Sequence, residues 1–147
     1  MAAPDIFTQA QQDAIKASID EAELMTSGEL RLFIDDHCKD ADPIKKAVKI
    51  FAELKMDKTD LRNGVLVYLS VKDHKFAIIG DKGIHEKVKD DFWNETKELM
   101  LSHFKNNQLV EGLTAGIKKA GAALAVHFPR QSNDSNELSN DIVFGNK

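Results

Sequence analysis

The residues of this chain best suited to chemistry follow an apolar stretch that breaks at Gly80. The stretch reads FAIIGDKGIHEKV, and its second half places Asp81, Gly83, His85 and Glu86 in a loop where a plain turn would need fewer charges. Carboxylates and backbone carbonyls are the ligands that hard divalent ions such as calcium take in proteins. Glycine lets the backbone turn its carbonyls inward. The pattern therefore raises the hypothesis of a loop that wraps a metal ion.

Two further loops are expected beside this one. Residues 29–35 (ELRLFID) and 64–71 (GVLVYLSV) read as strands separated by a helix, an order that normally gives parallel neighbours. Residues 76–79 return from the second strand through a short turn, so this hairpin strand runs in the opposite direction. The starts of the first two strands and the end of the third then lie at one edge. We expect three loops to converge there, namely Thr26 to Glu29, Asp57 to Asn63 and Gly80 to Asp91.

Side chains with oxygen atoms collect in or beside these three loops. They are Glu29, Asp57, Asp60, Asn63, Asp81, Glu86, Asp90 and Asp91. Carboxylates at close range repel one another unless a cation binds, which favours a metal site. Their spacing is less regular than that of an EF-hand loop. The alternative is that Asp81 caps a turn, Asp90 caps a helix and the other carboxylates are solvated.

Hydrophobic periodicity predicts the elements that position these loops. Besides the strands, we expect a helix from Thr8 to about Met25, a helix capped by Asp42, a helix capped by Asp90 or Asp91, and a last helix from about Leu109 to Val126. The apolar stripe of the second helix is Ile44, Ala47, Val48, Phe51 and Leu54. This order predicts an α/β fold, a three-layer α/β/α sandwich with a central mixed sheet. Three strands are evident, and the segment DIVFG near the C-terminus is apolar enough to dock.

The composition fits one domain with one core, since the chain has 147 residues of which 42% are hydrophobic and 30% charged. We place this domain at residues 1–129, and expect residues 130–147 to form a tail that is flexible or docked at the sheet edge. A net charge of −4 gives no basic field for nucleic acid or a membrane surface, so neither partner is expected. The N-terminus lacks the features of a secretory signal, and Cys38 is the single cysteine, so we expect a cytoplasmic monomer.

Two residues outside the acidic set invite other chemistry. Cys38 beside His37 suggests a thiol nucleophile or a zinc ligand, but the pair is predicted at the opposite sheet edge without an electropositive partner. His85 lies among hard oxygens, which favours an exposed or hydrogen-bonding role over zinc ligation. We therefore assign no catalytic residue from the sequence.

Four short stretches together carry a resemblance to the TPM domain family. They are TSGEL at Thr26, RNGVLVYL at Arg62, FAIIGDKGIHEKV at Phe76 and DFW at Asp91, and the likeness covers about residues 6–129. The chain is most similar to the short members in which the domain stands alone. The resemblance implies an α/β/α sandwich with a central mixed sheet of about four strands, with two crossing loops that can hold divalent metal, calcium being the usual candidate. Since three strands are evident, the segment DIVFG could supply the fourth at the edge of the sheet.

The resemblance also assigns metal ligands to particular residues. The motif GDKG brings Asp81, the motif RNG brings Asn63, and the acidic pair before FW brings Asp90 and Asp91. Asp60 and Glu86 join the set on their local chemistry alone. The expected metal ligands are therefore Asp81, Asn63, Asp60, Glu86, Asp90 and Asp91.

Function follows less directly than fold, because one fold supports many activities. Our main hypothesis is a metal-responsive regulatory or interaction module in which calcium joins the two loops. The first alternative is a metal-assisted acid phosphatase, since a plant thylakoid relative looks like one, although the chain has no Walker-type phosphate loop. The second alternative is a protein-binding scaffold without catalysis, which an exposed apolar patch would favour. Whether the protein is an enzyme stays open.

Overall fold

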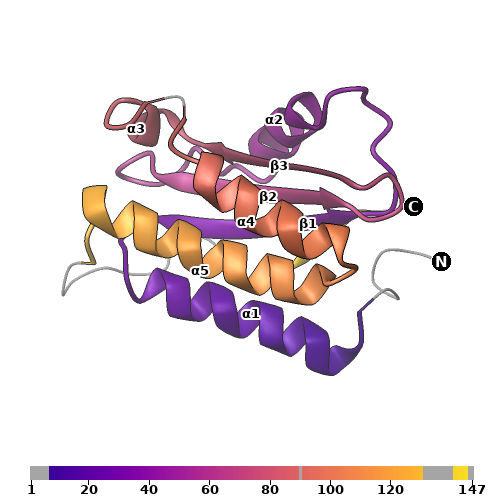
Figure 1. Cartoon of the computed structure of the whole chain (residues 1–147). Helices are drawn as coiled ribbons and strands as arrows, with labels where there is room; N and C mark the ends of the chain where they lie inside the picture. Colours follow the sequence, from indigo (N-terminus) through magenta and orange to yellow (C-terminus); the bar gives the residue numbers. More distant parts are fainter. Residues whose placement is uncertain (1–6, 90, 131–140, 146–147) are drawn as a thin grey trace.

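The computed structural model describes residues 7–89, 91–130 and 141–145 (Figure 1). The elements in chain order are α1 (Gln9–Glu23), β1 (Glu29–Asp35), α2 (Pro43–Glu53), β2 (Gly64–Ser70), β3 (Lys75–Gly80), α3 (Lys82–His85), α4 (Asn94–Lys105), α5 (Leu109–His127) and β4 (Val143–Phe144). No helix in these ranges is both long and apolar enough to cross a membrane. The predicted order of helices and strands is confirmed, with the one-turn helix α3 added after the hairpin.

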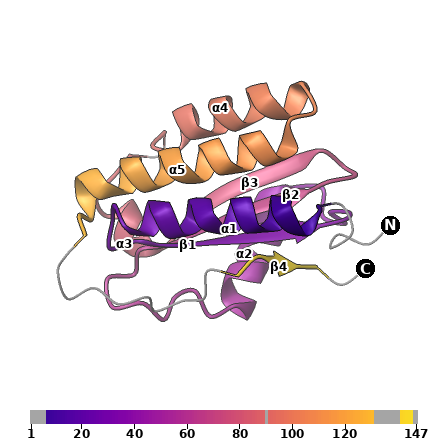
Figure 2. The same ribbon diagram turned by 90° about the horizontal axis from the view of Figure 1, so that it is seen from below.

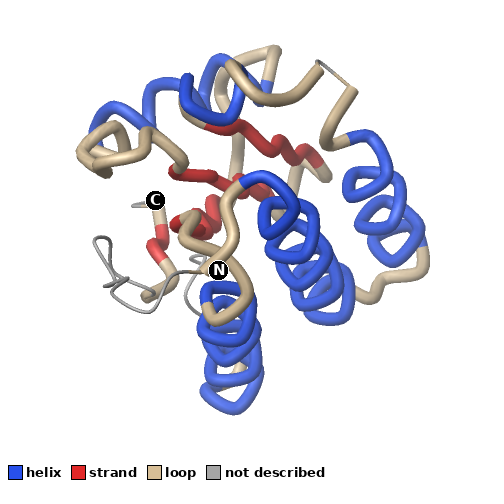
Figure 3. Tube along the Cα trace, turned by 90° about the vertical axis from the view of Figure 1, so that its left-hand side faces the viewer, coloured by secondary structure: helices blue, strands red, loops and turns tan. Residues whose placement is uncertain are grey.

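The strands form one mixed sheet in the order β3-β2-β1-β4. β1 is parallel to β2 and β2 is antiparallel to β3, as the connection through α2 and the hairpin predict. Helices α2 and α3 lie on one side of the sheet, and α1, α4 and α5 on the other (Figure 1). Seen from the second side, α5 runs between α1 and α4 (Figure 2), and the side view shows helices around both faces of the strands (Figure 3). The predicted α/β/α sandwich is therefore confirmed.

The fourth strand comes from the segment DIVFG. β4 pairs in parallel with the free edge of β1, matching Phe33 with Val143 and Ile34 with Phe144. The amide of Gly145 also donates to the carbonyl of Ile34 at 2.7 Å. Residues 131–140 lie outside the described part of the chain, so the boundary at residue 129 stays a prediction. The docked strand nevertheless shows that the C-terminal segment joins the sheet.

β2 is buried along its whole length, because the core has one layer on each face of the sheet. On one face Val65, Val67 and Leu69 pack with α1 and α5, and on the other Leu66 and Tyr68 pack beneath α2. This alternation follows from the two-residue period of a strand. Glycine in α5 allows close contact between helices. A Cβ at Gly121, for example, would lie 2.7 Å from the Cβ of Ala22, so α5 and α1 approach closely at that point.

One local prediction is wrong, and a second is confirmed in part. The helix expected after Asp90 or Asp91 begins later, at Asn94, and its N-cap is Trp93 without a side-chain hydrogen bond. Asp91 instead supplies a backbone carbonyl, which accepts from the amide of Asn94 at 3.0 Å, and Asp90 lies outside the described residues.

The apolar stripe predicted on α2 is partly buried. Ala47 is buried, and Phe51 and Leu54 pack against the core. Ile44 and Val48 are exposed, and Ile50 is buried in addition, because the helix is rotated so that part of the stripe faces solvent.

Candidate functional site

Three loops meet at one edge of the sheet, as the topology predicts. Glu29 at the start of β1 is paired with Gly64 at the start of β2, and Val65 is paired with Gly80 at the end of β3. Backbone hydrogen bonds extend this pairing into the loops. The amide of Glu29 donates to the carbonyl of Asn63 at 3.3 Å, and that of Asp81 donates to the carbonyl of Gly64 at 2.9 Å. The loop residues are therefore held by the same ladder that holds the strands.

Asp81 is buried at this edge, and its carboxylate accepts hydrogen bonds from two different residues. It is the N-cap of α3, where its Oδ1 accepts from the amide of Lys82 at 2.7 Å. Its carboxylate also accepts two hydrogen bonds from Arg62, with 2.7 Å between Oδ2 and Nε and 3.0 Å between Oδ1 and Nη2. The hydrogen bond to Asp81 raises the pKa of the Arg62 guanidinium. The strongest metal-ligand candidate is thus already paired with a cation of the protein itself.

Asn63 is a deeply buried polar residue of the site, with 1% of its surface exposed. Its amide donates to Oγ1 of Thr59 at 3.2 Å, and its side-chain Nδ2 donates to Oγ of Ser27 at 3.5 Å. Its Oδ1 is buried and has no hydrogen-bond partner among the residues described. A buried amide oxygen without a partner is unfavourable in a native fold, so this atom requires an explanation.

Gly83 marks the point where two loops cross in direct contact. Its amide donates to the carbonyl of Arg62 at 2.9 Å. A Cβ at this position would lie 2.2 Å from the carbonyl oxygen of Leu61 and 2.5 Å from that of Arg62, closer than any side chain tolerates. The sequence therefore needs glycine here for space, and two backbone carbonyls face the first turn of α3.

The other predicted ligands do not gather around Asp81. Asp60, Glu86 and Asp91 are exposed, and Asp90 lies outside the description. Within the described ranges, no group of three or more histidine, cysteine, aspartate and glutamate residues is placed to hold a metal ion. The neighbouring loops at this edge thus carry one carboxylate, one orphaned amide oxygen and two backbone carbonyls, and in the described part of the chain they form no cluster of carboxylates.

Sequence reasoning missed the role of Arg62. From the sequence we assign no role to this residue, although it opens the RNG motif. Its backbone adopts a φ of 51°, a left-handed conformation that is uncommon outside glycine, and this conformation is part of the turn that leads into β2. The predicted topology could have indicated the contact between Arg62 and Asp81, because the loops that carry these two residues were both expected at this edge.

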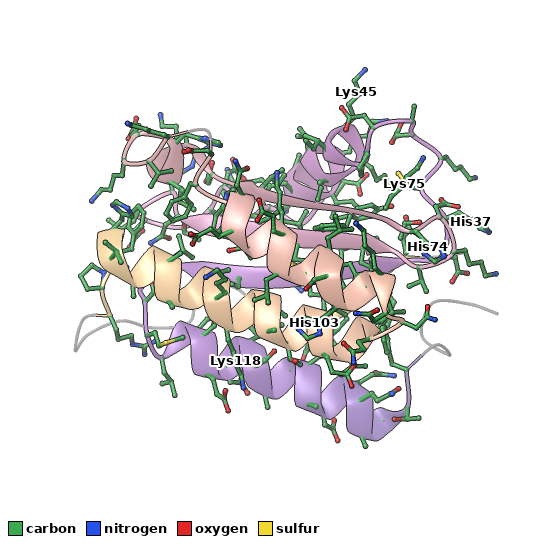
Figure 4. All side chains as sticks on the ribbon, in the orientation of Figure 1. His37, Lys45, His74, Lys75, His103 and Lys118 are labelled. Carbon is green, nitrogen blue, oxygen red and sulfur yellow. The ribbon has the colours of Figure 1, made fainter. Side chains whose placement is uncertain are left out.

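The opposite edge of the sheet carries a separate polar cluster around Asp73. His37 and His74 lie at that end of the molecule, far from α3 (Figure 4). His37 Nδ1 is 2.9 Å from Oδ1 of Asp73, and the amide of Cys38 donates to Oδ2 of the same carboxylate. Cys38 is buried and its thiol contacts the carbonyl of Asp40 at 3.2 Å. The predicted placement of Cys38 at this edge is confirmed, and its surroundings are those of a structural thiol.

Comparison with known proteins supports the same fold. The profile described as TPM domain matches residues 2–123. The structure is similar to the NMR structure of BA42 protein from the psychrophilic bacterium Bizionia argentinensis, with 43% identity, 95% of each chain covered and a TM-score of 0.89. It is also similar in fold to the N-terminal domain of cg2496 protein from Corynebacterium glutamicum, with 10% identity, coverage of 90% of this chain and 81% of that one, and a TM-score of 0.64. A search of curated protein sequences gives no significant match.

Proposed function

The chain belongs to the TPM domain family, and from this premise we propose that its crossing loops bind a divalent metal ion, calcium first among them, as a regulatory switch. The observation that carries the proposal is the Oδ1 atom of Asn63. This amide oxygen is buried at the loop edge and has no partner among the described residues. A bound cation would satisfy it, as amide carbonyls commonly do in calcium sites.

The donors present have the chemistry that calcium requires. Asp81 offers a carboxylate, Asn63 an amide oxygen, and Leu61 and Arg62 offer backbone carbonyls against Gly83. All of these are hard oxygen ligands, and none is the sulfur or imidazole that zinc prefers. Asp60, Glu86 and Asp91 are exposed, so a shell with three or more carboxylates requires the loops to rearrange. Asp90 remains a candidate on its sequence position alone.

Arg62 gives the site its regulatory character. Its guanidinium contacts both carboxylate oxygens of Asp81, so a metal ion and the guanidinium compete for the same acceptor. A metal that takes Asp81 releases the Arg62 side chain, which is 38% exposed and can turn to solvent or to another anion. We therefore propose that metal binding exchanges one cation for another and changes the charge presented beside the loops.

The test is a calcium titration of chelator-treated protein followed by amide NMR, with magnesium as the comparison ion. We expect saturable shifts at Asn63, Asp81 and Gly83, together with a calcium-dependent rise in melting temperature, because an ion that binds only the folded state stabilises it. Absence of saturable shifts at these three residues would contradict the proposal. A phosphatase assay on the same sample examines the enzymatic alternative.

No contact described at this edge specifically favours the phosphatase alternative. A carboxylate that attacks phosphorus or activates water must be free to do so. Both oxygens of Asp81 are instead occupied by Arg62 and by the cap of α3. Phosphoryl chemistry at this residue would first need the same release of Arg62 that metal binding requires.

We also propose that the domain acts as a monomer in the cytoplasm. The support is the lone, buried Cys38, which offers no disulfide within the chain or between copies. Light scattering after gel filtration tests the monomer, and a dimer mass at micromolar concentration would contradict it.

A further inference from the structure

A groove lies on the α2 side of the sheet, beside the crossing loops. It runs between α2 and the edge strand β3, reaches the start of α4, and has a volume of about 820 Å³. Figure 1 shows α2 and α3 on this face of the sheet, with β3 at its edge. Small-molecule sites in proteins have volumes of roughly 300–1,000 Å³. The groove therefore has the size of a ligand pocket.

One wall of the groove is apolar although much of it faces solvent. Ile44 and Val48 lie one turn apart on α2, with 45% and 55% of their surfaces exposed, and both line the groove. Phe51 continues the same line on the helix, and Ile79 faces it from β3. Ala47 and Ile50 are the buried residues of α2, and Phe51 is partly buried against the same core. The exposed pair Ile44 and Val48 is thus left for contact with something other than this sheet.

The charged residues that line the groove carry an excess of positive charge. Four of them are cations, Lys55, Lys58, Arg62 and Lys97, and two are carboxylates, Asp57 and Asp81. Arg62 is paired with Asp81, and Nζ of Lys58 lies 3.9 Å from Oδ2 of Asp57. In the described ranges, Lys55 and Lys97 form no ion pair. A local positive field on a chain of net charge −4 favours an anion in this groove.

We propose that the groove binds a small organic anion with an apolar body, such as an aliphatic carboxylate. The apolar part would lie between α2 and β3 against Val48 and Ile79, and the anionic head beside Lys55 and Lys97. A protein partner would need a wider contact, since stable interfaces bury roughly 800 Å² per partner and are not confined to one groove. The proposal does not depend on metal binding, because Lys55 and Lys97 are available without any change at Asp81.

The test uses dodecanoate as the probe, below the concentration at which it forms micelles and with a chelator present. We expect saturable amide shifts in α2, β3 and the first turn of α4, and no binding of dodecyltrimethylammonium, which has the same chain and the opposite charge. Because the chelator removes metal ions, failure here is distinct from failure of the metal site. No saturable shift with dodecanoate, or equal binding of the cationic probe, would overturn the proposal.

Variants distinguish binding of dodecanoate in the groove from its electrostatic attraction to the protein as a whole. Val48→Asp should weaken dodecanoate binding by about tenfold or more, because it removes apolar contact and adds a repelling charge. Lys97→Gln should weaken it by about two- to fivefold. The matched control is Val126→Asp on α5, which makes the same change at a residue that is 77% exposed and does not line the groove. An equal loss with Val126→Asp would overturn the proposal, since binding would then reflect net charge alone.

Discussion

Arg62 and Asp81 are nineteen residues apart in the chain and form a two-bond ion pair across the loop edge of the sheet. The pair connects the turn before β2 with the turn after β3, and Asp81 is only 6% exposed. A guanidinium in this position does what a bound cation would do, because it neutralises the buried carboxylate and holds two loops together. The protein therefore has its own means of holding these two loops together.

Asp81→Asn should weaken metal binding and leave the fold intact. Asparagine caps a helix as well as aspartate does, so α3 keeps its first hydrogen bond, but the charged oxygen ligand is lost. We expect calcium affinity to fall by roughly tenfold or more in the NMR titration. Asp13→Asn is the control, since it makes the same change on exposed α1. Equal calcium affinity in the Asp81 and Asp13 variants would remove Asp81 from the site.

Arg62→Gln should have two opposite effects. Without the guanidinium, the metal-free protein loses the ion pair at the loop edge and should melt at a lower temperature. Calcium no longer competes with a resident cation for Asp81, so its affinity should rise by about fivefold. Scanning calorimetry without calcium measures the melting temperature, and isothermal titration calorimetry with calcium measures the affinity. A fall in calcium affinity would mean that Arg62 supports the metal site instead of competing with it.

The placement of the site could be predicted from the sequence because it depends on strand direction alone. Alternation in ELRLFID and the continuous apolar run in GVLVYLSV identify two strands, and the intervening helix makes them parallel. Once the hairpin reverses the chain, Asn63 and Asp81 must lie at the same edge. The cap of α2 was also readable, because Asp42 before Pro43 is a helix-start signal and its side chain does accept from the amide of Ile44.

The contacts within the site could not be read in the same way. Which cation meets Asp81 depends on the left-handed backbone at Arg62, and several lysines were equally close in sequence. The start of α4 was misplaced because Asp91 is a favourable cap, yet the chain makes a further turn before Asn94. The exposure of Ile44 and Val48 depends on how α2 is rotated over the sheet, which periodicity does not specify.

Gly83→Ala should separate the crossing loops. The added Cβ would lie 2.2 Å from the carbonyl oxygen of Leu61, and backbone atoms on both sides cannot move without opening the turn. We expect a loss of about 1–3 kcal/mol in the free energy of unfolding, measured by urea titration. Gly80→Ala is the matched control, because its Cβ would meet only the Ile84 side chain, at 3.0 Å. If both variants lose the same stability, the crossing is not as tight as the structure indicates.

Acid should weaken the opposite edge of the sheet through Asp73. The hydrogen bond to His37, followed by that from the Cys38 amide, lowers the pKa of this carboxyl to about 2. A depressed pKa means that the unfolded chain binds a proton more readily, so Asp73 stabilises the fold above pH 4 and loses that effect as pH falls towards 2. Urea unfolding of wild type and Asp73→Asn between pH 5 and 2 measures this. The wild-type protein should lose stability more steeply, and parallel curves would contradict the assignment.

Removal of residues 141–147 should expose the edge of β1. The strand β4 covers that edge through the pairs Phe33–Val143 and Ile34–Phe144, and Phe144 packs against the core. We expect a loss of about 2 kcal/mol of stability, from the half-buried apolar surface and the hydrogen bonds of the pair. An unprotected strand edge also pairs readily with another chain, so the truncated protein should associate at concentrations where the full chain does not. Urea unfolding and light scattering measure the two effects, and deletion of residues 146–147 alone is the control. If truncation at residue 140 changes neither quantity, β4 contributes nothing to the sheet in solution.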